Sequence, residues 1–254
     1  MHQMDLTEGV IWKKLILYAG PVVLSSLLQS AYSITDLIVA GWFIGKDGIS
    51  AINNASQVMM ILTQIIMGIT TGGNILMGQY FGSKDRSNRV KTNRTMFGFA
   101  LSAGALLSVL LFLLSHPILA SLRAPALEEA TAYLQVCSAG LIAIFGYNAL
   151  AAMLRSVGHS KQPFYCVAVT AGCNIALDCL FMGGFRWGVR GAALATVLAQ
   201  WASFVVCLVY VLRHRDLFGL VWRQISFHKD KMVQILKLGI PCAVQMTVVG
   251  LSWL

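Results

Sequence analysis

Charged residues are scarce in this chain of 254 residues: they make up 11% of it, whereas a soluble globular domain typically carries about 25%. Hydrophobic residues make up 57%, and apolar runs near the ~20 residues that a bilayer crossing requires recur along the sequence. This balance excludes an ordinary soluble domain. We expect no cleavable signal peptide, because the first apolar run is long and continues past Asp36. The sequence therefore predicts an all-α, polytopic membrane protein.

Metal-binding cysteine motifs are also lacking. The chain has six cysteines, none of which forms a CxxC pair, and all of them fall within predicted spans. Cys166 and Cys173 share a helix face, but neither has a histidine or carboxylate at ligand spacing. We interpret the cysteines as small apolar filler, with a metal or disulfide site as the alternative.

The apolar runs predict spans at residues 15–44, 49–80, 95–115, 130–154, 163–183 and 191–212, with a seventh beginning near residue 235. When the loops are assigned alternately to the two sides, one side holds only four of the 19 lysines and arginines: Lys46, Arg123, Arg186 and Arg190. The positive-inside rule then places the N-terminus in the cytoplasm. The net charge of +9 is thus explained by topology, and we expect the lipid bilayer, and no nucleic acid, as a partner.

A faint internal repeat suggests how the chain is divided. Leu17-Tyr-Ala-Gly-Pro21 is matched by Lys237-Leu-Gly-Ile-Pro241, each opening an apolar run after a basic lead-in. After six spans and a linker, this match indicates a second structural repeat. We predict a six-helix lobe at residues 1–214, a cytoplasmic amphipathic linker at 215–234 and the start of a second lobe at 235–254. Because the chain stops inside the seventh span, we expect that most of the second lobe is missing.

Two carboxylates interrupt the apolar spans, Asp36 and Asp178. An ionisable group inside a bilayer costs ~3 kcal/mol on insertion scales, so it is first interpreted as a functional site. Helix rise places Asp36 ~15 Å, Asp178 ~12 Å and Thr196 ~9 Å below the outer boundary. Asn174 lies one helical turn deeper than Asp178 on the same face. A further carboxylate, Asp47, falls in a predicted loop, where we expect it to be solvated.

Carboxylate, amide and hydroxyl oxygens that share the outer half of the bilayer allow two kinds of chemistry. They can coordinate a hard cation such as Na⁺, or desolvation and mutual repulsion can make one carboxyl group a proton carrier. Both suit ion-coupled antiport. The alternative is that Asp36 and Asp178 lie apart, each satisfied by neighbouring donors. The candidates for a substrate cavity are Gln29, Tyr32 and Asn148; the first two could equally be helix contacts.

At this point the chain resembles the multidrug and toxic compound extrusion (MATE) family, over essentially its whole length, as that family's first lobe plus the opening of its seventh helix. The acidic first helix and the Asn-x-x-x-Asp pattern are similar to the DinF-type bacterial branch. The resemblance is carried by Pro21, Ser33-Ile-Thr-Asp36, Gly41, Gly78-Gln79-Tyr-Phe-Gly82, Leu154-Arg155-Ser-Val-Gly158 before Pro163, Asn174-Ile-Ala-Leu-Asp178 and Gly188-Val-Arg-Gly191-Ala-Ala-Leu-Ala-Thr196.

The resemblance implies twelve helices in two lobes of a bacterial cytoplasmic-membrane protein, which rock to export cationic or amphipathic compounds in exchange for H⁺ or Na⁺. It implies a bend of the first helix at Pro21, and no cofactor beyond the coupling ion. It also assigns the coupling site, and a possible Na⁺ site, to Asp36, Asn174, Asp178 and Thr196.

Three alternatives stay open. A flippase for lipid-linked saccharides is expected to line its cavity with arginine and lysine, and no span interior here has any. An intramembrane enzyme needs a nucleophile or metal constellation, yet His159, His214 and His228 have no acid at useful spacing, so we expect no enzyme. Finally, a single lobe could be an inactive fragment or pair with another half.

Overall fold

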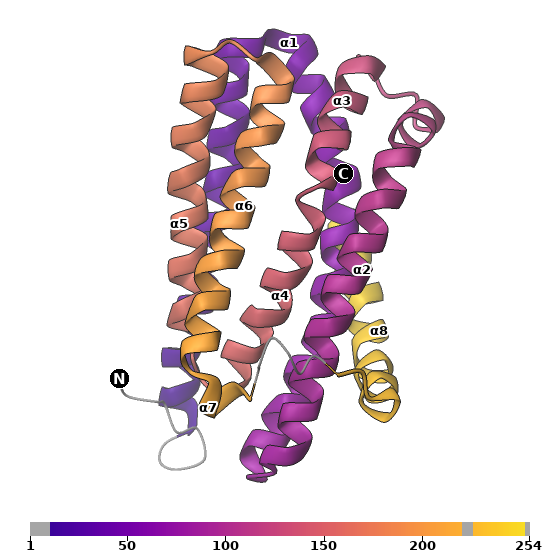
Figure 1. Ribbon diagram of the computed structural model, residues 1–254. Coiled ribbons are helices and arrows are strands. Elements are labelled where there is room, and N and C mark those ends of the chain that lie inside the picture. The colour runs from indigo at the N-terminus through magenta and orange to yellow at the C-terminus, as the bar shows by residue number, and fades with distance from the viewer. Residues whose placement is uncertain (1–10, 220–225, 252–254) are drawn as a thin grey trace.

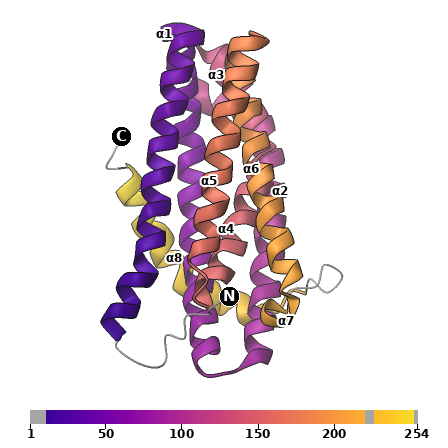
Figure 2. The same cartoon turned by 90° about the vertical axis from the view of Figure 1, so that its left-hand side faces the viewer.

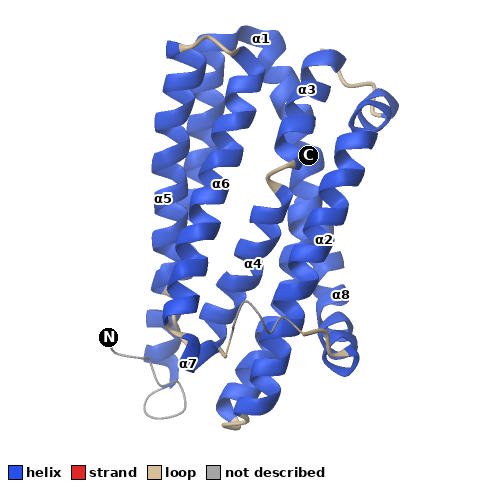
Figure 3. Cartoon of the chain, in the orientation of Figure 1, coloured by secondary structure: helices blue, strands red, loops and turns tan. Residues whose placement is uncertain are grey.

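Long helices dominate the structure, a computed structural model that describes residues 11–219 and 226–251 (Figure 1). The side chains of a few helical residues, Asp36 and Tyr32 among them, lie outside this description. The described residues contain no strand (Figure 3), so the all-α prediction is confirmed. The elements are α1 (Ile11–Gly82), α2 (Arg86–Ser121), α3 (Leu127–Ser138), α4 (Leu141–Ser156), α5 (Lys161–Asp178), the π-helical turn η1 (Cys179–Gly184), α6 (Gly188–Arg213), α7 (Arg215–Phe218) and α8 (Lys229–Leu251).

α1 contains the first two predicted spans, and a single residue separates them. Gly45 has φ 78° and ψ −168°, a left-handed conformation that glycine adopts without a steric penalty. The sequence predicted a loop around Asp47. That prediction is wrong, because the backbone is helical on both sides of Gly45 and this glycine alone makes the break.

The other predicted spans also fall on helices. Five described segments are long and apolar enough to cross a membrane: Gly48–Gly82, Arg86–Ser121, Lys161–Gly184, Gly188–Arg213 and Lys229–Leu251. Together, α3 and α4 make a sixth. With the first half of α1, every predicted span corresponds to helix, and the protein is a multi-pass membrane protein. The seventh helix begins at Lys229, six residues before the predicted start.

The predicted span 130–154 is not one straight helix, because α3 and α4 are bent by 48°. The break frees backbone carbonyls, which lipid cannot satisfy. Neighbouring helices supply the donors: Ser108 Oγ donates to the Ser138 carbonyl at 2.7 Å, and Trp201 Nε1 donates to the Ala139 carbonyl at 3.3 Å. The bend is therefore held by α2 on one side and α6 on the other.

α5 and α6 lie side by side on one flank of the bundle, α2 and α8 lie on the other, and α4 passes between them (Figure 1). Turned by 90°, the first half of α1 lies beside α5 (Figure 2). The largest fully buried side chains belong mainly to α2, α4 and the second half of α1, so the core lies where these helices meet. Large apolar side chains are exposed on the outer faces, as expected toward lipid; examples are Leu106, Val109, Leu113, Val205, Val206, Val244 and Val248.

One end of the bundle gathers the basic loops. The start of α1, the α1–α2 turn, the α4–α5 turn and α7 lie together at the lower end of Figure 1. We call this the basic end. The turn at Gly45 and the α5–α6 connection lie at the opposite end.

Candidate functional site

Two polar residues at the end of α5 are fully buried. Asn174 and Asp178 are each 0% exposed, although the helix around them is apolar. They are four residues apart, so they lie one above the other on the same helix face. α5 packs against both α1 and α6, which removes this face from lipid. The pair is thus buried between helices.

α6 brings a third polar group to this face. Asn174 Nδ2 donates to Thr196 Oγ1 at 3.4 Å, and Thr196 Oγ1 donates to the Ala192 carbonyl one turn earlier at 3.0 Å. Among the described residues, the buried Asn174 Oδ1 has no hydrogen-bond partner. An amide acceptor in such a place is costly unless something binds it. The Asn174–Thr196 contact joins two residues of different helices that the sequence placed in the outer half of the bilayer.

The helix changes its winding directly after Asp178. Residues Cys179–Gly184 form a π-helical turn, η1, before the chain turns back into α6. Single π-turns occur mostly inside α-helices and often at functional sites. The aromatic rings of Phe181, Phe185 and Trp187 stack on one another at centroid distances of 5.2–6.1 Å and close this end. The sequence analysis placed only the end of a span here and missed the π-turn.

The first half of α1 runs beside α5 in the same direction. Near the basic end, Tyr18 Oη donates to a backbone carbonyl at the end of α4 at 3.1 Å. Near the other end, the Phe43 ring packs onto Gly183, where a Cβ would lie 2.9 Å from it. Asp36 is seven residues before Phe43, and Asp178 is five before Gly183. Helix rise therefore puts the backbones of Asp36 and Asp178 within about 3 Å in height.

The Asp36 side chain lies outside the described residues, so its meeting with Asp178 stays a prediction. The same holds for Tyr32. Gln29 is exposed on α1. The helix continues through Pro21, and the bend predicted there is untested.

Asn148 is buried on α4, but it is not joined to the α5–α6 residues. Its Nδ2 donates to the Ile144 carbonyl of the preceding turn at 2.8 Å. Within the described part of the chain this is its only hydrogen bond, so Asn148 has none with Asn174 or Thr196. Its place in a substrate cavity stays a prediction.

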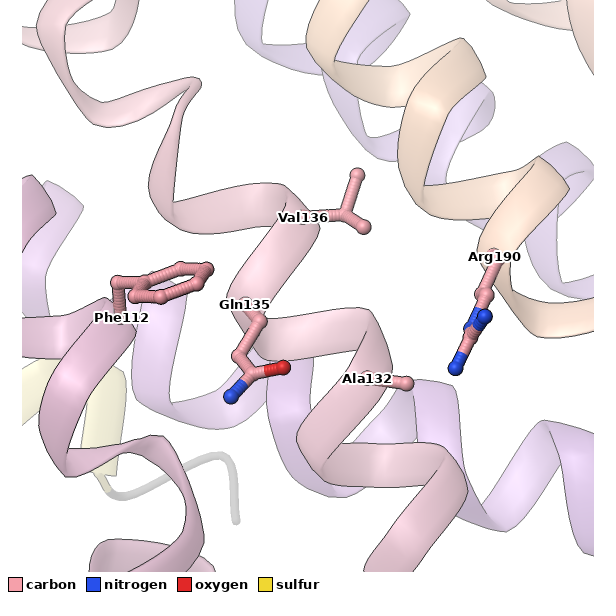
Figure 4. A pocket seen from close by; sticks show the side chains of 5 residues that line it. All are labelled: Phe112, Ala132, Gln135, Val136 and Arg190. Atoms are coloured by element: carbon pink, nitrogen blue, oxygen red, sulfur yellow. The ribbon is translucent and has the colours of Figure 1, made fainter.

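A separate hollow of about 230 Å³ lies between α2, α3 and α6 (Figure 4). None of its lining residues belongs to the group formed by Asn174, Asp178 and Thr196, which we call the α5–α6 cluster. The sequence analysis counted Arg190 only as a loop charge and missed this hollow. A polar residue within an apolar span, Gln135, was the available signal. The lining consists of Phe112, Ala132, Gln135, Val136 and Arg190.

The side chains of the α5–α6 cluster offer oxygen atoms that can act as ligands. A carboxylate, an amide oxygen and a hydroxyl are the ligands that hard cations prefer, and a carboxylate can instead take up a proton. The neighbouring stretches 15–45, 162–185 and 191–212 contain no lysine or arginine. The described residues also hold no group of three or more His, Cys, Asp or Glu side chains able to bind a metal. Oxygen ligands of this kind suit a proton or a hard cation.

This fold, a bundle of membrane-spanning helices with buried oxygen donors between two of them, defines a membrane-transporter lobe. A family model described as MatE matches residues 21–180, which is more than half of the chain. The chain belongs to the MatE family, whose members are transporters and not enzymes. The resemblance to that family is confirmed.

Named relatives span more than this chain does. The probable multidrug resistance proteins YoeA and YpnP of Bacillus subtilis (strain 168) are each 29% identical to it; they cover 95% and 98% of this chain, which spans 54% and 56% of theirs. The multidrug export protein MepA of Staphylococcus aureus is 22% identical; the match covers 97% of this chain and 55% of MepA. The chain thus spans about half the length of these relatives.

Solved structures show the same fold. A MOP superfamily transporter from Pyrococcus furiosus superposes with a TM-score of 0.89 at 22% identity, over 97% of this chain and 55% of the other. An outward-facing multidrug resistance MATE family transporter superposes with a TM-score of 0.85 at 22% identity, over 92% and 52%. At this identity the likeness concerns the fold alone.

Proposed function

We propose that this chain forms one lobe of an ion-coupled efflux antiporter, which exports cationic or amphipathic compounds in exchange for H⁺ or Na⁺. The observation that carries the proposal is the fully buried Asp178, one turn from an Asn174 that bonds to Thr196. A buried carboxylate among oxygen donors, within a family of transporters, is the kind of group that binds a coupling ion. The names of YoeA, YpnP and MepA support drug export as the direction of transport.

In this proposal Asp36, Asn174, Asp178 and Thr196 form the coupling site. Binding of a proton or Na⁺ at Asp178 neutralises charge between α5 and α1, which changes how α1 packs and displaces the substrate. Because the ion binds one state better than the other, its gradient shifts the population between them.

The proposed placement follows the charges. The basic end faces the cytoplasm by the positive-inside rule, in a bacterial cytoplasmic membrane. Residues 1–214 make the lobe, 215–234 the linker, whose last residues from Lys229 on already belong to α8, and 235–254 the start of the second lobe. The names and lengths of the bacterial relatives support this division.

The test is transport by the complete protein in proteoliposomes under an imposed pH or Na⁺ gradient. Asp178→Asn is expected to abolish the response to the gradient. The matched control is Asp216→Asn, which makes the same change at an exposed position of α7. Gradient-driven export that persists in Asp178→Asn would overturn the assignment of Asp178, and export driven by only one of the two gradients would identify the ion.

A further inference from the structure

A polar contact at the basic end fastens α8 to α1. Lys231 is only 5% exposed, and its Nζ donates to Tyr80 Oη at 2.9 Å. The ammonium also lies 4.7 Å from the centre of the Tyr80 ring. Tyr80 Oη in turn donates to Gln234 Oε1 at 3.1 Å. On its own helix the ammonium also lies 3.7 Å from the carboxylate of the exposed Asp230. Because an ammonium loses much solvation on burial, the contacts with Tyr80 of α1 add to this exposed ion pair in stabilising it.

Beyond this contact the backbones of the two helices touch. A Cβ at Gly72 would lie 2.4 Å from the Gly239 backbone nitrogen, and a Cβ at Gly68 would lie 2.1 Å from Ala243 Cα. Such approach is possible only between small residues, as in tightly packed membrane helix pairs. From residue 231 to residue 243, α8 is therefore held along the second half of α1 by polar contacts first and by backbone packing after them.

The segment leading to α8 is fixed as well. Four side chains of α2 donate to four consecutive carbonyls of this segment, residues 216–219, at 2.7–3.0 Å. Because backbone carbonyls are the acceptors, the attachment does not depend on which side chains the segment carries. The donors, in order, are Arg86, Arg89, Asn93 and Arg94.

We propose that Tyr80, Lys231 and Gln234 are positioning residues that make the α1–α8 contact a fixed pivot. The basic-end half of α8 then moves with the first six helices throughout the transport cycle, and the rest of the complete protein swings around it. This explains a residue of the Gly78–Gly82 motif to which the coupling site gives no role: Tyr80 is its centre. The inference rests on the proposed function for the transport cycle, but the attachment itself can be measured without transport.

The decisive experiment locks the contact. Tyr80→Cys and Gln234→Cys are combined in the complete protein, and the two thiols are joined by a short bifunctional methanethiosulfonate, which spans the gap left by the two shortened side chains. We expect the cross-linked protein to transport at the rate of its uncross-linked form, because a fixed pivot does not open. Loss of transport on cross-linking, restored by dithiothreitol, would show that the contact opens as a gate and would overturn the inference. The parent protein with its six native cysteines, treated in the same way, is the control.

A second measurement does not need transport. In Lys231→Met we expect amide hydrogen exchange of residues 229–240 to rise by about tenfold or more, as on losing a hydrogen bond to a charged group. Lys237→Met is the matched control, because Lys237 is exposed on the same helix. Tyr80→Phe keeps the ring and removes only the hydroxyl, so we expect a smaller rise over the same residues. Equal exchange in the two lysine variants would overturn the inference. If exchange rises in Lys231→Met as expected but the unmodified protein does not transport, only the proposed function is contradicted.

Discussion

Buried polar side chains gather in two regions of this molecule, and they bind different things. At the basic end, buried cations and amides bind acceptors that the chain itself supplies: Arg89 bonds to a backbone carbonyl, and Lys231 to a tyrosine. Between α5 and α6, acceptor oxygens gather in a stretch of sequence without lysine or arginine, and the Asn174 amide donates to a hydroxyl, Thr196 Oγ1, and not to a backbone carbonyl. The first arrangement attaches one segment of the chain to another; the second gathers oxygen atoms with no basic side chain in the same stretches.

The sharpest way to break this comparison is to replace the buried asparagine of the α5–α6 cluster. For Asn174→Leu we expect ion-driven transport by the complete protein to fall by about tenfold or more, a typical coupling effect. We expect the thermal stability in detergent to stay the same or rise, because Thr196 Oγ1 keeps its own bond to the Ala192 carbonyl when the Asn174 amide is removed. A marked loss of stability would show that Asn174 is structural.

The close contact of α8 with α1 predicts a large effect on stability alone. For Gly72→Ala, the new methyl group would collide with the Gly239 backbone, and we expect a loss of about 1–3 kcal/mol, as for overpacking. Gly78→Ala is the matched control on the same helix, because its nearest neighbour lies at 4.0 Å. The free energy of unfolding in detergent measures both. Equal stability of the two variants would contradict the packing described here.

A matched asparagine at the basic end should respond in the opposite way to Asn174. In Asn93→Leu, the Phe218 carbonyl loses its 2.7 Å donor, so we expect a loss of about 1–3 kcal/mol in stability. We also expect faster proteolysis of the segment before α8. Lys91→Leu, at an exposed position of α2, should change neither measurement. If Asn93→Leu were as stable as the unmodified protein, the two regions would not differ as proposed.

The smallest effect concerns pH at the α4–α5 turn. Burial, and secondarily the nearby His214, lower the pKa of His159 below its ordinary value. The unfolded chain therefore takes up this proton first as the pH falls, so the His159 contribution is present above pH ~6.5 and is lost below it. We expect His159→Gln to flatten the fall of melting temperature between about pH 7 and pH 5. His116→Gln, at an exposed position, should leave the curve unchanged.

Much of the fold could be predicted from the sequence, because lipid demands long apolar helices and punishes unpaired backbone groups. For the same reason a carboxylate within an apolar span identified Asp178 as a candidate site residue, and the four-residue spacing placed Asn174 on the same helix face. The α3–α4 bend could not be predicted in this way. Its carbonyls are satisfied by Ser108 and Trp201, which lie 30 and 62 residues from their partners.

The basic residues of α2 show a second limit of the sequence analysis. Arg86, Arg89 and Arg94 were explained by topology alone, because a charge count does not reveal what each guanidinium binds. Their partners are backbone carbonyls more than 120 residues away, and carbonyls leave no pattern in a sequence. Asp36 marks the remaining gap: the sequence gives its depth, and the structure gives the height of its backbone but not the direction of its side chain.

The π-helical turn after Asp178 determines the direction in which the polar face of α5 points. A π-turn is one residue longer than the α-helical turn it replaces, and one residue corresponds to ~100° of rotation about the helix axis. The aromatic stack anchors the far side of this turn. Deleting a single residue between Cys179 and Gly184 would therefore rotate Asn174 and Asp178 by that angle about the helix axis, away from Thr196, without removing either side chain. The orientation of this site thus depends on the number of residues in η1 as well as on the side chains of α5.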